Sequence, residues 1–135
     1  MSQFLSPSPQ LLPNYKNELF DVVMNWSLSW RGQQFEKCAA AHLTKSGYSV
    51  QEFAAGNKAK VIIDTPQLIQ TALSQKSELI ILAHYHPAIN AQPSIEDKRT
   101  TRRISLLCRT LEVTLIDHII FSQSDHFSFR QAGYL

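Results

Sequence analysis

The residues with the clearest chemical pattern are His84 and His86, which follow a run of apolar residues and are separated by Tyr85. On an extended strand, side chains at positions i and i+2 point to the same face, so the two imidazoles can meet at one point. Imidazole nitrogen is a common ligand of zinc in proteins. The spacing therefore predicts two ligands of a metal site at the end of a strand. Taken in isolation, a His-x-His pair is also compatible with an ordinary surface or core position.

Ser94 and Asp97 supply the second half of the pattern. Asp97 lies in the first turn of a helix predicted to begin at Ser94, from which its carboxylate can return toward the strand end. Two imidazoles and one carboxylate leave the fourth tetrahedral position open for water, which is the layout of a catalytic zinc site. Ser94 and Asp97 also fit a helix N-terminus, where both would satisfy backbone donors, and the two roles can coexist.

The elements that must position these residues are predicted to alternate between helix and strand. An amphipathic helix is predicted from Asn14 to about Trp30, and a second helix begins at Asp64-Thr65-Pro66. Ser94 begins the third helix. The expected strands are a hairpin of 36–43 and 48–53, a buried strand 78–84, and two closing strands at 113–121 and 127–130. This order predicts an α/β domain over residues 14–135 with one mixed sheet flanked by helices, preceded by a mobile arm over residues 1–13.

Apolar residues at helical spacing mark the helix faces expected to be buried. On the second helix these are Leu68, Ile69 and Leu73. On the third helix they are Ile104, Leu107, Cys108 and Leu111.

Composition places the chain among ordinary globular domains. It has 135 residues, of which 44% are hydrophobic and 18% charged, and a net charge of +2, so disordered and collagen-like classes are excluded. Cys38 and Cys108 have no paired metal spacing and are expected to be reduced core residues. No secretory signal and no apolar run long enough to cross a bilayer is present, so the expected location is cytoplasmic, without membrane contact.

The pattern His84-x-His86-Pro87-x6-Ser94-x2-Asp97 resembles the signature of the JAMM (JAB/MPN) metallopeptidases. The surrounding sequence is similar to the RadC-like branch of that superfamily. The resemblance covers roughly residue 31 onward, more faintly the first helix, and implies a single-domain JAB/MPN-like, cytidine-deaminase-like fold. The similar segments are 93–97, Thr101-Arg102-Arg103, 115–120 and 127–135.

The resemblance also implies a chemistry. His84, His86 and Asp97 would hold Zn2+, whose activated water attacks an amide or isopeptide carbonyl of a peptide or protein conjugate. Ser94 would donate a hydrogen bond to the oxyanion.

The general base of the family precedes a turn like the one at residues 44–47, which places it at Glu36. Glu52 and Glu78 are the competing residues, and a lone Glu at a strand edge is also compatible with a solvated charge. Glu78 would lie at the far end of its strand from His84, which counts against it.

Several residues depart from the RadC-like pattern. Tyr85 stands between the histidines where a small polar residue is usual, and Ala88-Ile89-Asn90 replaces a loop with Ser and Gly. These changes predict a bulkier loop beside the metal and altered access to it. Gln67 lies near the position where an arginine is expected, so substrate recognition is predicted to differ.

Other residues allow a second class of function. Lys98, Arg99, Arg102 and Arg103 cluster on the third helix, either as a solvated face or as a grip on a phosphate backbone or an acidic partner. The alternative function is a RadC-like DNA-associated binding module whose metal is structural or absent.

The remaining histidines are assigned from their neighbours in the sequence. Asp117 and His118 form either a pair that orients a metal ligand or a satisfied core pair. His42 and His126 lack spaced partners and are interpreted as structural. Zinc deaminases are excluded because their His-x-Glu and Pro-Cys-x-x-Cys motifs do not occur.

Overall fold

The computed structural model describes residues 12–53 and 62–135. Helix α1 (Leu12–Trp30) begins two residues before the predicted start at Asn14. Pro13 is accommodated there because the first turn of a helix does not need its missing N–H. The predicted arm lies outside the described residues as far as residue 11.

Five strands form one sheet in the order β2-β1-β3-β4-β5. Strands β3 and β4 are parallel, and the other neighbouring pairs are antiparallel. The predicted α/β class with a mixed sheet is therefore confirmed. The remaining elements are β1 (Lys37–Thr44), β2 (Gly47–Phe53), α2 (Thr65–Gln75), β3 (Leu79–Tyr85), α3 (Ile95–Thr110), β4 (Thr114–Phe121) and β5 (His126–Ser128).

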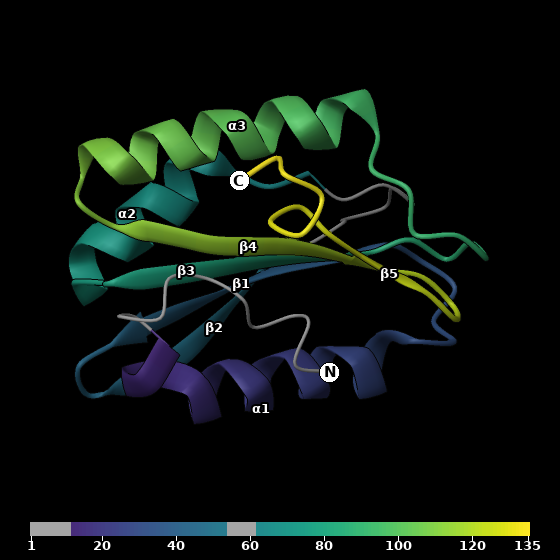
Figure 1. Cartoon of the computed structure of the whole chain (residues 1–135), viewed down its shortest axis with the longest axis horizontal. Helices are drawn as coiled ribbons and strands as arrows, with labels where there is room; N and C mark the ends of the chain where they lie inside the picture. Colours follow the sequence, from purple (N-terminus) through teal and green to yellow (C-terminus); the bar gives the residue numbers. More distant parts are fainter. Residues whose placement is uncertain (1–11, 54–61) are drawn as a thin grey trace.

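The sheet lies between two helical layers, with α1 below it and α2 and α3 above it in Figure 1. Odd-numbered residues of β1 and β3, such as Ala39 and Ile81, pack in one apolar cluster with α1. Even-numbered residues, such as Ala40 and Leu82, pack in a second cluster with α2 and α3. Side chains alternate between the two faces of a strand, so parity in β1 and β3 tells which helical layer a residue meets.

Two predictions of buried residues were wrong. Leu73 is 56% exposed and Leu107 is 38% exposed, whereas Ala72 and Thr101 are buried. Each leucine lies about 100° around its helix from the neighbour that faces the sheet, Ala72 or Cys108. On α2 the pattern selected Leu73 in place of the smaller Ala72, and on α3 it selected Leu107 as well as Cys108, which alone of these two is buried.

Within the described ranges, none of the helices combines the length and the apolar character that a membrane span requires.

His42 is fully buried at the end of the sheet away from His84, opposite Ile80 in the register of β1 and β3. Its Nδ1 lies 2.9 Å from Ser77 Oγ, and its Nε2 lies 2.8 Å from Gln51 Oε1. The Gln51 carbonyl oxygen can only accept, so His42 donates from Nε2 and accepts from Ser77 at Nδ1. Burial lowers the pKa of His42 below its ordinary value of 6.5.

His42 should make the fold sensitive to acid. Below pH 6.5 the unfolded chain takes up a proton that folded His42 resists, so stability falls as pH drops toward the lower folded pKa. The free energy of unfolding should lose about 1.4 kcal/mol per pH unit in that window from this residue alone. Urea denaturation of the wild type and of His42→Gln between pH 7.5 and 5 measures the difference. Two parallel stability profiles would contradict the assignment.

Candidate metal centre

The antiparallel register of β1 and β3 brings the predicted residues to one face of the sheet. Cys38 lies opposite His84, and Lys37 lies opposite Tyr85. Extending this register by one residue places Glu36 opposite His86. All four even-numbered residues therefore share the face covered by α3. The backbone N–H of His86 donates to Phe121 O at 2.8 Å, which continues the pairing of β3 with β4 beyond Tyr85.

Tyr85 points to the opposite face. Its side chain is fully buried in the α1 cluster, and its hydroxyl donates to Gln33 O and accepts from Gly32 N, both at 3.2 Å. The expectation that Tyr85 adds bulk beside the metal was therefore wrong. Instead, Tyr85 ties the segment that leads into Glu36 to the end of β3, between His84 and His86.

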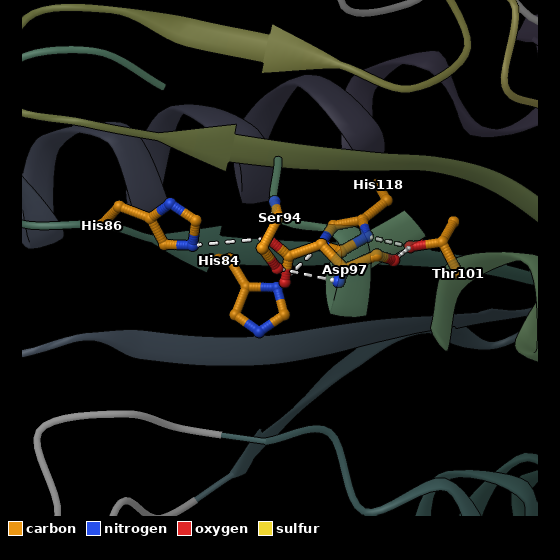
Figure 2. A network of polar contacts seen from close by, with 6 residues as sticks. All are labelled: His84, His86, Ser94, Asp97, Thr101 and His118. Atoms are coloured by element: carbon orange, nitrogen blue, oxygen red, sulfur yellow. Dashed lines mark hydrogen bonds and ion pairs between the residues drawn. The ribbon is translucent and has the colours of Figure 1, made fainter. Parts of the chain in front are cut away.

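Ser94 and Asp97 form the predicted capping structure at the start of α3. Ser94 Oγ accepts from Asp97 N at 3.0 Å, and Asp97 Oδ2 accepts from Ser94 N at 2.8 Å (Figure 2). These two bonds satisfy backbone donors that a helix N-terminus otherwise leaves unpaired. They also fix the Asp97 carboxylate on the side of α3 that faces the end of β3.

His86 and Asp97 lie within reach of a shared ion. His86 Nε2 is 3.7 Å from Asp97 Oδ2, and both side chains are mostly buried (Figure 2). This distance exceeds that of an N–H···O hydrogen bond. Two ligands bound to one tetrahedral zinc lie about 3.4 Å apart, given their usual bond lengths. The separation is therefore close to that of two ligands of one zinc ion.

His84 lies beside this pair. Its ring centroid is 6.0 Å from that of His86, and its side chain is buried. Its Nδ1 lies 2.8 Å from His118 Nε2. Across residues 12–53 and 62–135, no three His, Cys, Asp or Glu side chains are grouped closely enough to hold a metal ion. The structure thus brings His86 and Asp97 together, with His84 adjacent on the same face and not closed into a triad.

Glu36 is half-buried and immediately precedes β1. The pKa of Cys38 shows which charges lie near Glu36. Burial raises this pKa most, and the negative charges of Asp97 and Glu36 raise it further. Both carboxylates are therefore near the same buried thiol. Glu52 is exposed on β2, and Glu78 donates its N–H to Leu43 O at the opposite end of the sheet. Glu52 pairs with Ala39, whose side chain packs in the α1 cluster, so Glu52 lies near the histidine end but on the opposite face. Of the three candidates, Glu36 alone combines the histidine end of the sheet with the face that His84 shares.

Asp117 and His118 do not act as one side-chain pair. The Asp117 carboxylate accepts from Ser128 Oγ at 2.6 Å and from the backbone N–H groups of Arg130 and His118. Burial raises the pKa of Asp117 to about 6. His118 lies opposite Leu82 in the register of β3 and β4, with its ring toward α3. Asp117 therefore anchors the turn after β5, while His118 contacts His84 and Thr101.

Sequence reasoning missed two neighbours of the site. Cys38 lies two residues after Glu36, and Thr101 lies four residues after Asp97. These spacings place each on the same face of its strand or helix as a candidate site residue, so the signal was available. Thr101 is buried, and its hydroxyl donates to Asp97 O at 2.7 Å.

Comparison with known proteins shows which family of domains this sequence matches. The model of the RadC-like JAB domain matches residues 16–134. A UPF0758 protein of Burkholderia cenocepacia is 31% identical over 105 residues, covering 76% of this chain and 41% of its own length. A UPF0758 protein of Burkholderia ambifaria is 34% identical over 86 residues, covering 64% of this chain and 33% of its own length. The chain thus spans well under half of these relatives, and their names state no activity.

The N-cap of α3 can be tested against the N-cap of α2, where Asp64 Oδ1 accepts from Gln67 N at 3.1 Å. We expect Ser94→Ala and Asp64→Ala each to lower the free energy of unfolding by about 1 kcal/mol, since each removes one capping acceptor. Their effects should add, because the caps are on separate helices. Urea denaturation measures both, with Ser94→Thr as the variant that keeps the hydroxyl. A Ser94→Ala variant as stable as the wild type would show that this cap contributes nothing.

Proposed function

We propose that this chain, which belongs to the RadC-like JAB domain family, is a zinc-dependent hydrolase that cleaves amide or isopeptide bonds. The observation that supports this most is the convergence at one end of the sheet. The Asp97 carboxylate lies 3.7 Å from His86 Nε2, with His84 beside them on the same face. Extending the β1–β3 register one residue beyond Lys37 and Tyr85 would put Glu36 opposite His86. A peptide or a protein conjugate is the proposed substrate.

The donor set suits zinc. His84, His86 and Asp97 would hold the ion through two imidazole nitrogens and one carboxylate oxygen, a combination that catalytic zinc sites use. When bound, zinc would supply Lewis acidity and a water made nucleophilic near neutral pH. Asp97 keeps its backbone bond to Ser94 through Oδ2, so its orientation is set by the fold before any ion binds.

Glu36 is the proposed general base. It is half-buried beside His86 in the extended register, which is where a carboxylate could reach a water at the metal centre. As the water oxygen bonds to the carbonyl carbon, Glu36 takes one water proton. It then passes that proton to the amine nitrogen as the C–N bond breaks, so Glu36 ends the cycle as a carboxylate.

Ser94 is the proposed oxyanion donor. Its Oγ accepts from Asp97 N, which leaves the hydroxyl's own proton to be donated elsewhere. Donation to the developing oxyanion would stabilise the transition state by about 3 kcal/mol, as single donors of this kind do. The cap and the catalytic role therefore use different parts of the same hydroxyl.

Nucleic-acid binding through α3 has less support. Lys98, Arg99, Arg102 and Arg103 are exposed, as that function would need. However, Lys98 Nζ lies 4.9 Å from the centre of the Tyr134 ring, and Arg99 forms an exposed ion pair with Glu96 at 4.0 Å. Half of the predicted basic cluster is thus engaged with the chain's own residues.

Zinc binding is the first test. Titration of metal-free protein with zinc should give one bound ion, with binding lost in His86→Ala and in Asp97→Ala, because each removes a ligand. His126→Ala is the control, since His126 lies on β5, pairs with Phe121 of β4 and has no proposed role at the metal. Wild-type protein that binds no zinc, or an Asp97→Ala variant that binds it equally well, would refute the proposed site. Salt-dependent DNA binding that survives both ligand substitutions would instead favour the binding module.

Turnover is the second test. Zinc-loaded protein is screened against isopeptide-linked and C-terminally extended peptides. We expect Glu36→Gln to keep zinc and to lower kcat about 100- to 10,000-fold, the usual contribution of a general base. Glu52→Gln is the matched control, because Glu52 is exposed on β2. An undiminished kcat in Glu36→Gln would remove Glu36 from the mechanism.

A further inference from the structure

We propose that Thr101 and His118 are positioning residues that hold His84 in the tautomer with its proton on Nδ1, so that Nε2 is the nitrogen presented to a divalent cation. This inference rests on the proposed function for the identity of the ion. The tautomer itself is a property of the metal-free protein and can be measured without zinc.

Three hydrogen bonds connect His84 to the backbone of Asp97 (Figure 2). Thr101 Oγ1 lies 2.7 Å from Asp97 O. His118 Nδ1 lies 2.6 Å from the same hydroxyl, and His118 Nε2 lies 2.8 Å from His84 Nδ1. The chain of bonds therefore begins at the carbonyl of one proposed ligand and ends at the ring of another.

The direction of each bond follows from the first. A backbone carbonyl only accepts, so Thr101 must donate its single hydroxyl proton to Asp97 O. The Thr101 oxygen must then accept from His118, which puts a proton on His118 Nδ1. In a neutral imidazole the other nitrogen carries no proton, so His118 Nε2 accepts from His84 Nδ1–H. His84, if neutral, then carries its lone pair on Nε2.

The surroundings of His118 favour the neutral ring that this direction requires. The side chain is fully buried. Its ring is stacked on Phe129, with centroids 4.6 Å apart and planes 6° from parallel. A charged imidazolium would be poorly solvated between an aromatic ring and two neutral hydrogen-bonding groups. Phe129 also fixes the plane of His118, and with it the direction from which His84 is held.

The second partner of Thr101 distinguishes this bond from an ordinary feature of helices. Threonine in a helix often donates to the carbonyl four residues earlier, as Thr110 does to Leu106 O at 3.0 Å on the exposed side of α3. Thr101 makes the same bond but is buried and also accepts from His118. Thr110 therefore offers a matched control on the same helix.

The test combines a tautomer measurement with zinc affinity. Long-range 1H–15N correlation spectra of metal-free wild-type protein should show His84 and His118 both protonated on Nδ1. In Thr101→Val the hydroxyl is lost with little change in size, and His84 should no longer be confined to that tautomer. Its zinc Kd should rise about 10- to 100-fold, the usual cost of losing a group that orients a metal ligand. Thr101→Ser and Thr110→Val should both retain the wild-type tautomer and Kd.

The outcomes separate this inference from the proposed function. If His84 of the metal-free wild type is protonated on Nε2, the proposed hydrogen-bond chain from Thr101 through His118 to His84 is overturned, even if zinc binds. Unchanged zinc affinity in Thr101→Val would overturn its effect on the metal. If the wild type binds no zinc while His84 is protonated on Nδ1, the hydrolase proposal fails and the proposed control of the His84 tautomer stands. The wild-type spectrum decides the tautomer even where Thr101→Val fails to fold.

Discussion

The antiparallel register between β1 and β3 is the constraint on which the candidate metal centre depends. Seven residue pairs, from Lys37 with Tyr85 to Leu43 with Leu79, hold the two strands in register. A slip of one residue would turn every side chain of one strand to the opposite face. Glu36 and Cys38 would then meet the α1 layer, away from His84. Both faces of these strands are buried under helices, so such a slip would also place the wrong side chains in both cores.

The parts of the site that could be predicted from sequence are those fixed by local geometry. His84 and His86 share a face because a strand repeats every two residues, and Ser94 pairs with Asp97 because a helix cap joins positions three apart. The alternating order of helices and strands gave the fold class in the same way. Glu36 could not be predicted from local spacing, because it is far from the histidines in sequence and only sheet pairing brings it near them. The family resemblance alone selected it.

The parts that were missed depend on which face of the sheet meets which helix. Alternation already implied that Tyr85 points away from its two neighbours, and likewise that Asp117 and His118 cannot share a face. Which of the latter two turns toward His84 depends on how β4 pairs with β3, where the register shifts near Ile80 and Ile81. Sequence spacing does not reveal that irregularity. The role of Phe129 is equally nonlocal, because the ring it stacks on belongs to another strand.

Asp97 shows how the fold orients the carboxylate that we propose as a metal ligand. Its backbone N–H and one carboxylate oxygen are used in the cap, and its backbone carbonyl receives the Thr101 hydroxyl. The interactions that begin α3 thus also orient this carboxylate, so a bound ion would not have to create its orientation. The same bonds thus serve both the helix cap and the carboxylate. Any change that weakens the start of α3 must therefore also loosen the Asp97 carboxylate.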